Sequence, residues 1–423
     1  MRLLKSRFVK DSGTLLSGNM VAQGVGFAAY LVLSRLFTPE DFGLYNIFYS
    51  YIEVLIILST CKYELAIVKA DSDEEANQLA RLTLRMNAWV SGVLLTAALV
   101  LYVTKASILP MPSILVLFIP MMVFFCGTTR VYTFIFNRYK SYRHIATSEV
   151  ATSLSGVVIK MGLGLMNGMV TALHTLGMPL GTILGKVVGN SYLRHQISKE
   201  HIEIPQKIQA PKTLAKKYLN FPLYVMPKEF VSSFSANLPF MWLSVYFDNA
   251  LIGLFSLALT FTMRPLGILA SGFEKVFYSS TIEKVRQQQP IGHNIRRFVI
   301  GLNAVVIPAA VVANFFAEPI FVFLFGEKWI GTGYFVSCIL PWFVVLLTTN
   351  SLAFVANIFS TQRADFLFQI AQLVLRIVAL GIGCHVHDFK LAIMLFCCVS
   401  ALVQLGQLIW YLCQIRKYQQ GLK

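Results

Sequence analysis

The sequence predicts an all-α polytopic membrane protein, with about twelve transmembrane helices in two six-helix lobes related by a parallel pseudo-twofold repeat. Of its 423 residues, 56% are hydrophobic and only 13% are charged, whereas soluble domains have about 25% charged residues. Apolar runs of about 20 residues, the length needed to cross a bilayer, recur along the whole chain. A short segment near the start also recurs in the second half.

The expected spans follow one another with short connections. The first one comes after a basic stretch, residues 2–10, which is expected to form a short amphipathic helix on the cytoplasmic surface. The apolar run that follows is too long for a signal peptide and has no cleavage site of small residues. The first six spans are expected at 14–37, 43–61, 84–104, 114–136, 148–168 and 172–192.

The second half has the same number of apolar runs. Prolines within several spans, such as Pro120 and Pro265, predict bent helices, because proline removes a backbone hydrogen bond. Bent helices are tolerated in membranes where neighbouring helices or water satisfy the freed carbonyl group. The last six spans are expected at 223–246, 250–272, 297–317, 333–358, 367–385 and 391–413.

The connections between spans give the expected orientation. With the N-terminus inside, the cytoplasmic connections have 26 Lys and Arg residues, and the opposite ones have only Arg35, Lys105, Lys328 and Lys390. This bias predicts that both termini are cytoplasmic. The longest connection, 193–222, is basic and has no apolar core, so it is expected to be a cytoplasmic linker between an N-lobe (1–192) and a C-lobe (223–423).

The composition excludes several classes of function. The net charge of +16 is scattered between apolar runs, which suits an anionic membrane surface or substrate rather than nucleic acid. None of the seven cysteines forms a CxxC pair, so neither a disulfide framework nor a zinc site is expected. The segment "GTILGKVVG" (181–189) is one residue too short for a P-loop and lacks its Ser or Thr. Because no catalytic motif and no soluble domain is found, we expect a non-enzyme that needs no cofactor or metal.

Charged residues inside the spans are the candidate binding groups, because such residues rarely face lipid. Lys160, Arg264 and Arg376 lie near the middle of their spans. Arg130 and Lys186 lie nearer the cytoplasmic end, where a long side chain can reach water. A cavity lined by these cations would attract an anion, above all a phosphate, which arginine binds with two parallel hydrogen bonds.

The acidic residues of the spans have two possible roles. Glu53 and Glu149 are candidates for coupling to a proton or another cation, and they could instead form internal salt bridges with the basic residues. Lys228 and Glu229 are neighbours in sequence and are expected to form a local or interfacial pair.

One segment is repeated at an offset of half the chain. The residues "FTPEDFGLYNIF" (37–48) align without gaps on "FDNALIGLFSLA" (247–258), so that Phe37 meets Phe247 and Gly43 meets Gly253. Each segment joins the first span of its half to the second. This pattern is typical of transporters built from parallel repeats.

Several segments resemble those of the Wzx-like polysaccharide flippases of the MOP superfamily. They include a "TPEDFGLY" turn after the first span, "FNRYKSYRHIATSEV" after the fourth and "YLNFPLYVMPKEFVSSFSANLPFMWLSVYF" at the seventh. The segments "IGLFSLALTFTMRPLGILASGFEKVFY" and "FGEKWIGTGYF" also fit, so the resemblance extends in order over nearly the whole chain.

The resemblance implies a function in glycan export. Members move an undecaprenyl-diphosphate-linked oligosaccharide from the inner to the outer leaflet of the bacterial inner membrane, by alternating access, for O-antigen, capsule or exopolysaccharide assembly. A cationic cavity would bind the diphosphate, with Arg264 the first candidate, followed by Arg376, Lys160, Lys186 and Arg130. Asn19, Gln23 and Asn237 are candidate sugar contacts. Membrane lipids, a glycan polymerase and chain-length proteins are the expected partners.

Three other functions remain open at this point. A drug or organic-cation exporter of the same superfamily would have an acidic cavity. A membrane-embedded polysaccharide polymerase or ligase would have a large loop on the outer side, where this chain has only short ones. A membrane scaffold that transports nothing would not need charges inside its spans.

Overall fold

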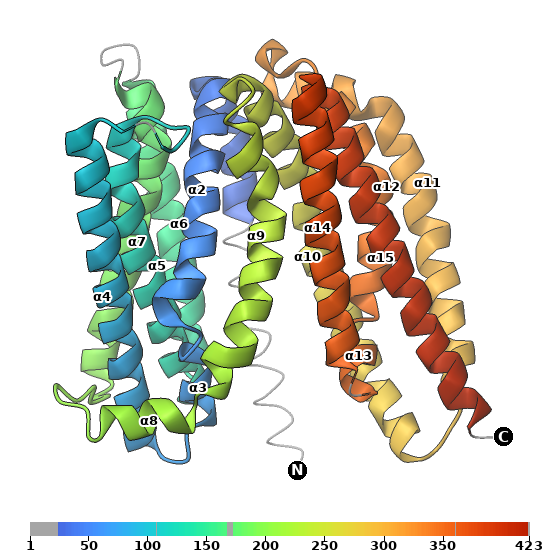
Figure 1. Ribbon diagram of the computed structural model, residues 1–423, viewed down its shortest axis with the longest axis horizontal. Helices are drawn as coiled ribbons and strands as arrows, with labels where there is room; N and C mark the ends of the chain where they lie inside the picture. The colour runs from blue at the N-terminus through green and yellow to red at the C-terminus, as the bar shows by residue number, and fades with distance from the viewer. Residues whose placement is uncertain (1–23, 107, 167–171, 360, 422–423) are drawn as a thin grey trace. The chain divides into compact units, whose positions relative to one another are not determined.

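The computed structural model is helical and describes residues 24–106, 108–166, 172–359 and 361–421, a part of the chain in which no strand occurs (Figure 1). The expected all-α fold is therefore confirmed. The chain forms two compact units, unit 1 (Met1–Asn237) and unit 2 (Leu238–Lys423). The division falls inside helix α9 (Met226–Leu243), and the lobe division at 193–222 stays a prediction.

The described part of unit 1 contains five long helices and several short ones. A helix at Gly24–Leu36 precedes α2, and a π-helical turn at Phe221–Val225 leads into α9. The other helices are α2 (Pro39–Thr60), α3 (Glu64–Lys69), α4 (Asp73–Thr104), α5 (Ser113–Arg138), α6 (Tyr142–Leu165), α7 (Ala172–Lys199) and α8 (Pro211–Lys217).

Unit 2, as far as it is described, also contains five long helices after the second half of α9. A 3₁₀ turn at Glu327–Trp329 separates the second of these from the third. The helices are α10 (Asn249–Arg286), α11 (Gly292–Phe325), α12 (Thr332–Ser351), α13 (Phe354–Ile358), α14 (Gln362–Val386) and α15 (Phe389–Gln420).

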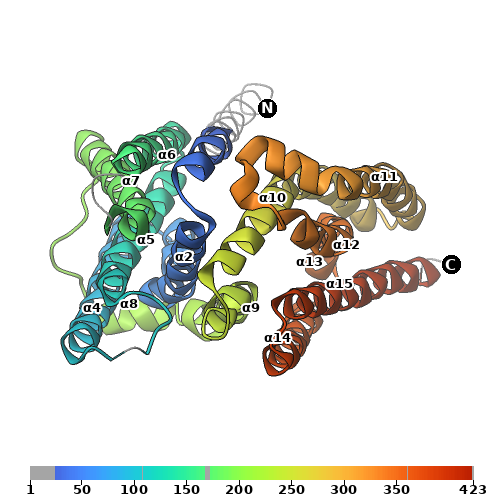
Figure 2. The same ribbon diagram turned by 90° about the horizontal axis from the view of Figure 1, so that it is seen from above.

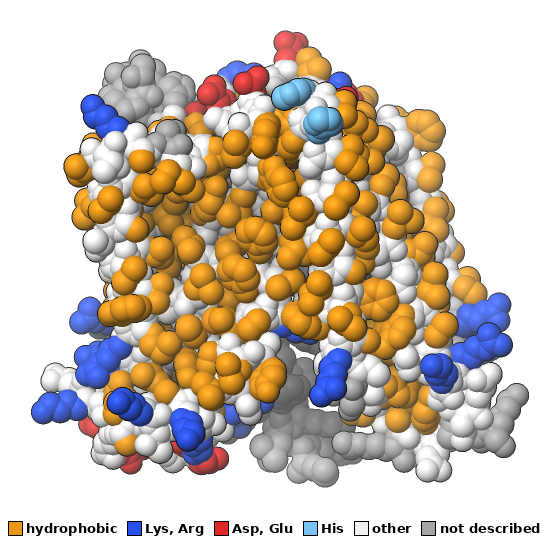
Figure 3. Space-filling model, in the orientation of Figure 1, with side chains coloured by type: hydrophobic (Ala, Val, Ile, Leu, Met, Phe, Trp, Pro, Cys, Tyr) orange, Lys and Arg blue, Asp and Glu red, His pale blue; other side chains and the backbone are white. Residues whose placement is uncertain are grey.

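Each expected span overlaps a helix, the first one over its described part, Gly24–Leu36, and many of these helices are long and apolar enough to cross a membrane. Among the described residues seven qualify by length and composition, so the chain is a multi-pass membrane protein; the number twelve stays a prediction. Over the helices of unit 1, Figure 3 shows hydrophobic side chains between the two helix ends and Lys and Arg side chains gathered at the end where α8 lies. The seven helices are Pro39–Thr60, Asp73–Thr104, Ser113–Arg138, Gly292–Phe325, Thr332–Ala356, Gln362–Val386 and Phe389–Gln420.

The two repeated segments begin corresponding helices. In the first, the Thr38 side chain accepts a hydrogen bond from the Asp41 backbone N–H, and the Asp41 carboxylate accepts one from the Thr38 N–H, which together form a capping box. The helix starts at Pro39, a residue suited to the first turn. In the second segment the helix starts at Asn249, the position that aligns with Pro39.

The packing within each unit follows the same order. In unit 1, α5 packs against α2, α4 and α7, and α6 packs against α7; Figure 2 shows these helices end-on. In unit 2, α12 packs against α10, α11 and α15, and α14 packs against α15. The third long helix is thus the centre of each unit, and the last two form a hairpin, as a parallel repeat requires.

The basic connection after α7 is partly folded onto unit 1. Leu214 and Tyr218, in and after α8, are buried in the cluster that also contains Tyr63, whose hydroxyl donates to the backbone carbonyl of Ala215 at 3.0 Å. Lys217 Nζ donates to the Asp71 carboxylate at 2.7 Å. This hydrogen bond and the lysine charge hold the pKa of Asp71 below its usual range.

Candidate functional site

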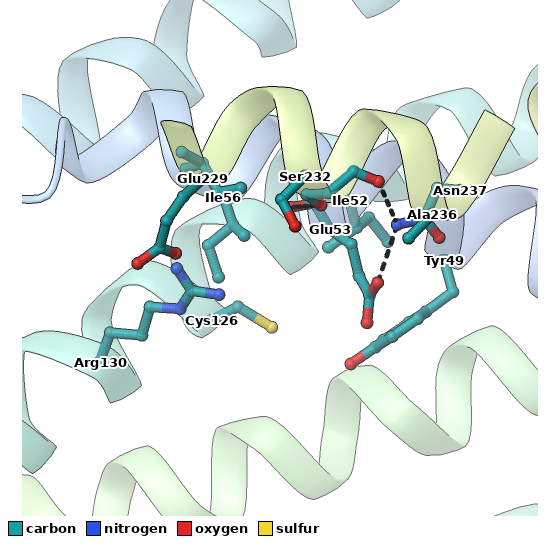
Figure 4. Close-up of a pocket in the computed structure, with 12 residues that line it drawn as sticks. Tyr49, Ile52, Glu53, Ile56, Cys126, Arg130, Glu229, Ser232, Ala236 and Asn237 are labelled. Atoms are coloured by element: carbon teal, nitrogen blue, oxygen red, sulfur yellow. Dashed lines mark hydrogen bonds between the residues drawn. The ribbon is translucent and has the colours of Figure 1, made fainter. Parts of the chain in front are cut away.

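Unit 1 contains a cavity of about 380 Å³ between α2, α5 and the first half of α9 (Figure 4). Three of the predicted site residues line it although they are far apart in sequence: Glu53, Arg130 and Asn237. Their helices also contribute Tyr49, Cys126, Glu229 and two serines, so the wall is unusually polar for a membrane protein. We call this space the charged cavity.

A hydrogen bond joins α2 to α9 across the charged cavity. Asn237 Nδ2 donates to Glu53 Oε2 at 3.0 Å and to the backbone carbonyl of Ser233, also at 3.0 Å. Asn237 is buried, whereas the Glu53 side chain is exposed to the cavity. The amide therefore fixes the carboxylate in place while leaving part of it accessible to a ligand.

Opposite charges meet at the other end of the charged cavity. Lys62 Nζ lies 2.5 Å from Glu229 Oε2 and 3.9 Å from the buried carboxylate of Glu64. Figure 4 shows the Arg130 and Glu229 side chains pointing toward one another. The Nη1 atom of Arg130 is enclosed and has no hydrogen-bond partner within the described part of the chain. An enclosed N–H group without a partner is costly, which makes Arg130 receptive to an anion.

The partner of Glu229 differs from the sequence prediction. Glu229 was expected to pair with its neighbour Lys228, but its carboxylate binds Lys62. Lys62 itself was counted among the cations of a cytoplasmic connection, yet its side chain is buried. The reason is the turn after α2, where Cys61 and Lys62 both have left-handed backbone conformations, with φ of 45° and 62°. Such strain persists only where the surroundings impose it.

Two further predicted cations lie behind the wall of the charged cavity. Lys160 Nζ lies over the ring of Tyr45 at 4.8 Å from its centre, and Tyr45 stacks on the cavity residue Tyr49 at 5.9 Å. Lys186 lies within electrostatic reach of Cys126 on the cavity wall and of the predicted coupling residue Glu149. Of these residues only Tyr49 and Cys126 line the cavity themselves.

The other two predicted arginines belong to unit 2. Arg264 is half-buried on α10, directly before Pro265. Arg376 is only 4% exposed; its Nε donates to Ser400 Oγ at 2.8 Å, and its guanidinium lies 4.5 Å from the ring centre of Phe396 and 5.2 Å from that of Trp342. Arg376 could contact a substrate only if this aromatic packing opened.

Glu53 and Glu229 line the charged cavity together with Arg130, so its wall has charges of both signs. The expected cationic cavity stays a prediction. The candidate sugar contacts Asn19 and Gln23 lie outside the described residues. Within the described part, no group of three His, Cys, Asp or Glu residues could hold a metal ion.

Comparisons with known proteins agree with this architecture. A family model described as "Polysaccharide biosynthesis protein" matches residues 32–333, and none of the curated proteins matches the chain by sequence. The structure of the lipid II flippase MurJ in an inward closed conformation superposes with a TM-score of 0.75 at 12% identity, over 96% of this chain and 90% of that one.

Two other solved structures have the same fold. One is a multidrug resistance MATE family transporter of the MOP superfamily in an inward-facing conformation, with a TM-score of 0.66, 14% identity and coverage of 94% and 96% of the two chains. The other is a MOP superfamily transporter from Pyrococcus furiosus, described as having a binding pocket of reverse polarity, with a TM-score of 0.62, 13% identity and coverage of 97% and 96%. All three are transporters or flippases rather than enzymes, in agreement with the expectation of a non-enzyme.

Proposed function

Because the chain belongs to the polysaccharide biosynthesis protein family, we propose that it is a flippase for an undecaprenyl-diphosphate-linked oligosaccharide. It moves this lipid from the inner to the outer leaflet of the bacterial cytoplasmic membrane by alternating access, for O-antigen, capsule or exopolysaccharide assembly. Both termini lie in the cytoplasm. The predicted membership of this family is confirmed by the family match, and the fold shared with a lipid II flippase supports the choice of substrate class.

The observation that carries the proposal is the position of Arg130. Among the described residues it is the one basic residue that lines the charged cavity, and its enclosed Nη1 has no partner there. A diphosphate would accept hydrogen bonds from this guanidinium. These hydrogen bonds would replace the water that the diphosphate loses on leaving the membrane surface. The polyprenyl tail is apolar and can stay in the hydrocarbon of the bilayer.

The polar wall of the charged cavity suits a sugar. Glu53 and Asn237 together offer an accepting carboxylate and a donating amide, and Ser232, Ser233 and Tyr49 offer hydroxyl groups. Hydroxyl-rich ligands are recognised by such placed donors and acceptors. Glu53 is also a candidate for binding a coupling proton or cation, with Glu149 as the second candidate.

The remaining cations extend the same proposal. Arg264, the position that the family resemblance favours most, would meet the diphosphate during transport, and Arg376 would do so after its aromatic packing opens. Lys160 and Lys186 lie behind the cavity wall, where their charges make the interior more favourable for an anion without direct contact.

The test is glycan export by cells that produce variants of the protein at normal membrane levels. We expect Arg130→Ala and Arg264→Ala each to reduce export at least about tenfold, because a bidentate phosphate contact is lost. Arg130→Lys keeps the charge and should retain part of the activity. Arg143→Ala removes an exposed arginine outside the cavity and should change nothing. Full export by normally expressed Arg130→Ala would refute the assigned role of this residue.

A second candidate function is supported by the two carboxylates of the charged cavity. Glu53 and Glu229 could attract an organic cation, as a drug exporter of the same superfamily requires. Glu53→Gln separates the two functions: it should abolish the efflux of a cationic dye by an exporter. In a flippase it should leave Arg130 able to bind the diphosphate and reduce glycan export only in part.

A further inference from the structure

A second cavity of unit 1, of about 610 Å³, lies between α4, α5, α7 and the segment that follows α7. It shares no lining residue with the charged cavity. Both cavities use α5, but Cys126 and Arg130 face the charged cavity whereas Phe124 and Thr128 face the second one, as expected for opposite sides of a helix. A ligand in the second cavity therefore binds separately from the proposed substrate.

Three arginines line the second cavity, which we call the arginine cavity: Arg81 and Arg85 near the start of α4, and Arg194 near the end of α7. All three lie at the helix ends where basic residues gather. Tyr132 of α5 lies within electrostatic reach of both Arg81 and Arg194, so charges from two helices meet in one space.

These charges are not balanced by the described part of the protein. None of the three arginines forms an ion pair with a described residue. The Nε of Arg81 is enclosed and has no hydrogen-bond partner there, and Arg85 donates only to the backbone carbonyl of Gln206, at 2.5 Å. Glu200, in the neighbouring segment, pairs with His144. Arg81 is half-buried and Arg85 and Arg194 are exposed, so the three cations are accessible to an anion from outside.

Apart from Thr128, Tyr132 and Ser198, the rest of the wall is apolar, which indicates the kind of anion. Leu84, Ala88, Phe124 and Ile197 line it from the helices, and two isoleucines of the segment after α7 close it: Ile202 and Ile204. A free inorganic anion would gain nothing from these side chains, whereas an amphiphile would use both halves of the cavity.

The surface beside the cavity continues this apolar half. Trp89, one turn beyond Arg85, is 73% exposed, and the exposed residues Val93, Val100 and Val103 follow on adjoining positions of α4. Tryptophan is enriched at the level of lipid headgroups, where one side of the ring meets the acyl chains. The cavity thus lies at headgroup depth, with a lipid-facing apolar stripe leading away from it.

We propose that the arginine cavity binds an anionic glycerophospholipid of the surrounding membrane. The phosphate diester accepts hydrogen bonds from Arg81, Arg85 and Arg194, and the acyl chains lie along the exposed face of α4. Basic pockets between transmembrane helices are suited to such headgroups. The bound lipid would neutralise the arginines of α4 and α7 and so remove their mutual repulsion at this end of unit 1.

The test measures lipid binding to the purified full chain in detergent by native mass spectrometry, with phosphatidylglycerol, phosphatidylcholine and inorganic phosphate as separate probes. We expect phosphatidylglycerol to bind and phosphatidylcholine not to compete with it. The double variant Arg81→Ala/Arg85→Ala should bind phosphatidylglycerol at least about tenfold more weakly. Arg143→Ala/Lys199→Ala removes the same charge from exposed positions outside the cavity and should bind normally.

A second variant tests the apolar half of the arginine cavity without changing the charge of the protein. Ala88→Trp fills the apolar half of the arginine cavity and should also weaken phosphatidylglycerol binding. Its matched control is Gly162→Trp on α6, outside the cavity, where a Cβ atom would meet no other atom within 4 Å.

Three results would overturn the proposal. Unchanged phosphatidylglycerol binding by the double variant would exclude the arginines as its ligands. Displacement of the lipid by millimolar inorganic phosphate would show a site for a free anion only. Loss of phosphatidylglycerol binding in Arg130→Ala would assign the lipid to the charged cavity, whereas normal binding there keeps this proposal distinct from the proposed transport function.

Discussion

At the scale of single residues, the most unusual feature is the burial of Lys62 in a strained turn. Its ammonium group is neutralised by Glu229 at 2.5 Å and lies 3.9 Å from the buried Glu64. Removing one partner of a buried ion pair costs more than the pair contributes, because the remaining charge stays in a poor solvent. The lysine therefore places its charge between two carboxylates of unit 1.

This arrangement predicts a non-additive pair of substitutions. Lys62→Met should lower the stability of the protein by about 1–3 kcal/mol, less than for a fully buried pair because Glu229 is half exposed. Glu229→Gln should restore part of that loss in the Lys62→Met background, since the unpaired charge is removed. Thermal unfolding in detergent measures both effects. Lys199→Met, at an exposed position, is the matched control, and strictly additive shifts would contradict the pairing.

The sequence could not predict this ion pair. Lys62 follows an apolar run directly, so a count of loop charges assigns it to water, and only the left-handed turn at Cys61 and Lys62 brings it inside. Glu229 lies 167 positions away in sequence, and no local pattern connects the two. By contrast, Glu53, Arg130 and Asn237 were predicted as site residues individually, because polar residues inside apolar runs are conspicuous.

At the scale of helices, glycine spacing explains how α6 and α7 approach each other. Gly181, Gly185 and Gly189 recur every fourth residue and line one side of α7. A Cβ atom at Gly185 would lie 2.7 Å from the Thr152 carbonyl oxygen and 2.9 Å from the Cα of Gly156. The segment compared with a P-loop in the sequence is thus a contact surface of small residues, as in many membrane helix pairs.

Two identical substitutions on this hairpin should have opposite effects. Gly185→Ala should destabilise the protein by about 1–2 kcal/mol, because overpacking against α6 outweighs the gain in helix propensity. Gly162→Ala lies in open space on α6 and should be neutral or slightly stabilising. Thermal unfolding of both variants checks the prediction. Equal shifts would mean that α6 and α7 do not pack through this surface.

A polar ladder joins the corresponding hairpin of unit 2. Its three levels are Asp365 with Gln407 and Tyr411, Gln372 with Gln404, and Arg376 with Ser400. The polar residues of α14 and α15 recur at helical spacing, a signal that the sequence contains. From the sequence, Arg376 was predicted as a phosphate ligand and was not connected to the polar residues of α15. The register between two antiparallel helices cannot be obtained from either helix separately. Hydrogen bonds of this kind hold membrane helices together.

At the scale of the whole molecule, the internal repeat was accessible from the sequence because it preserves both a turn and an order of spans. The aligned turns begin α2 and α10, and the third long helix is the centre of each unit. The alignment of single residues was weak, but the repeated packing order supports the same pairing of helices. What the sequence could not supply is which faces of these helices meet, since a continuous apolar run has no distinct buried side.

The charge distribution predicts the orientation of every connection at once. Arg143, at the start of α6, and Lys199, at the end of α7, belong to the basic side, whereas Lys105 and Lys390 belong to the other. Single cysteines at these four positions, in a chain whose own seven cysteines are replaced by alanine, should differ in their reaction with a membrane-impermeant thiol reagent. In intact cells whose outer membrane is made permeable, Lys105→Cys and Lys390→Cys should react rapidly.

Arg143→Cys and Lys199→Cys should react only after the inner membrane is opened, because basic residues stay on the cytoplasmic side during insertion. Reaction of all four after lysis is the control for accessibility, and all four positions are exposed in the structure. Labelling of Arg143→Cys in intact cells would reverse the orientation. The arginine cavity lies at the same end of unit 1, so it would then face the outer leaflet. The leaflet from which the transported lipid starts would be the outer one as well.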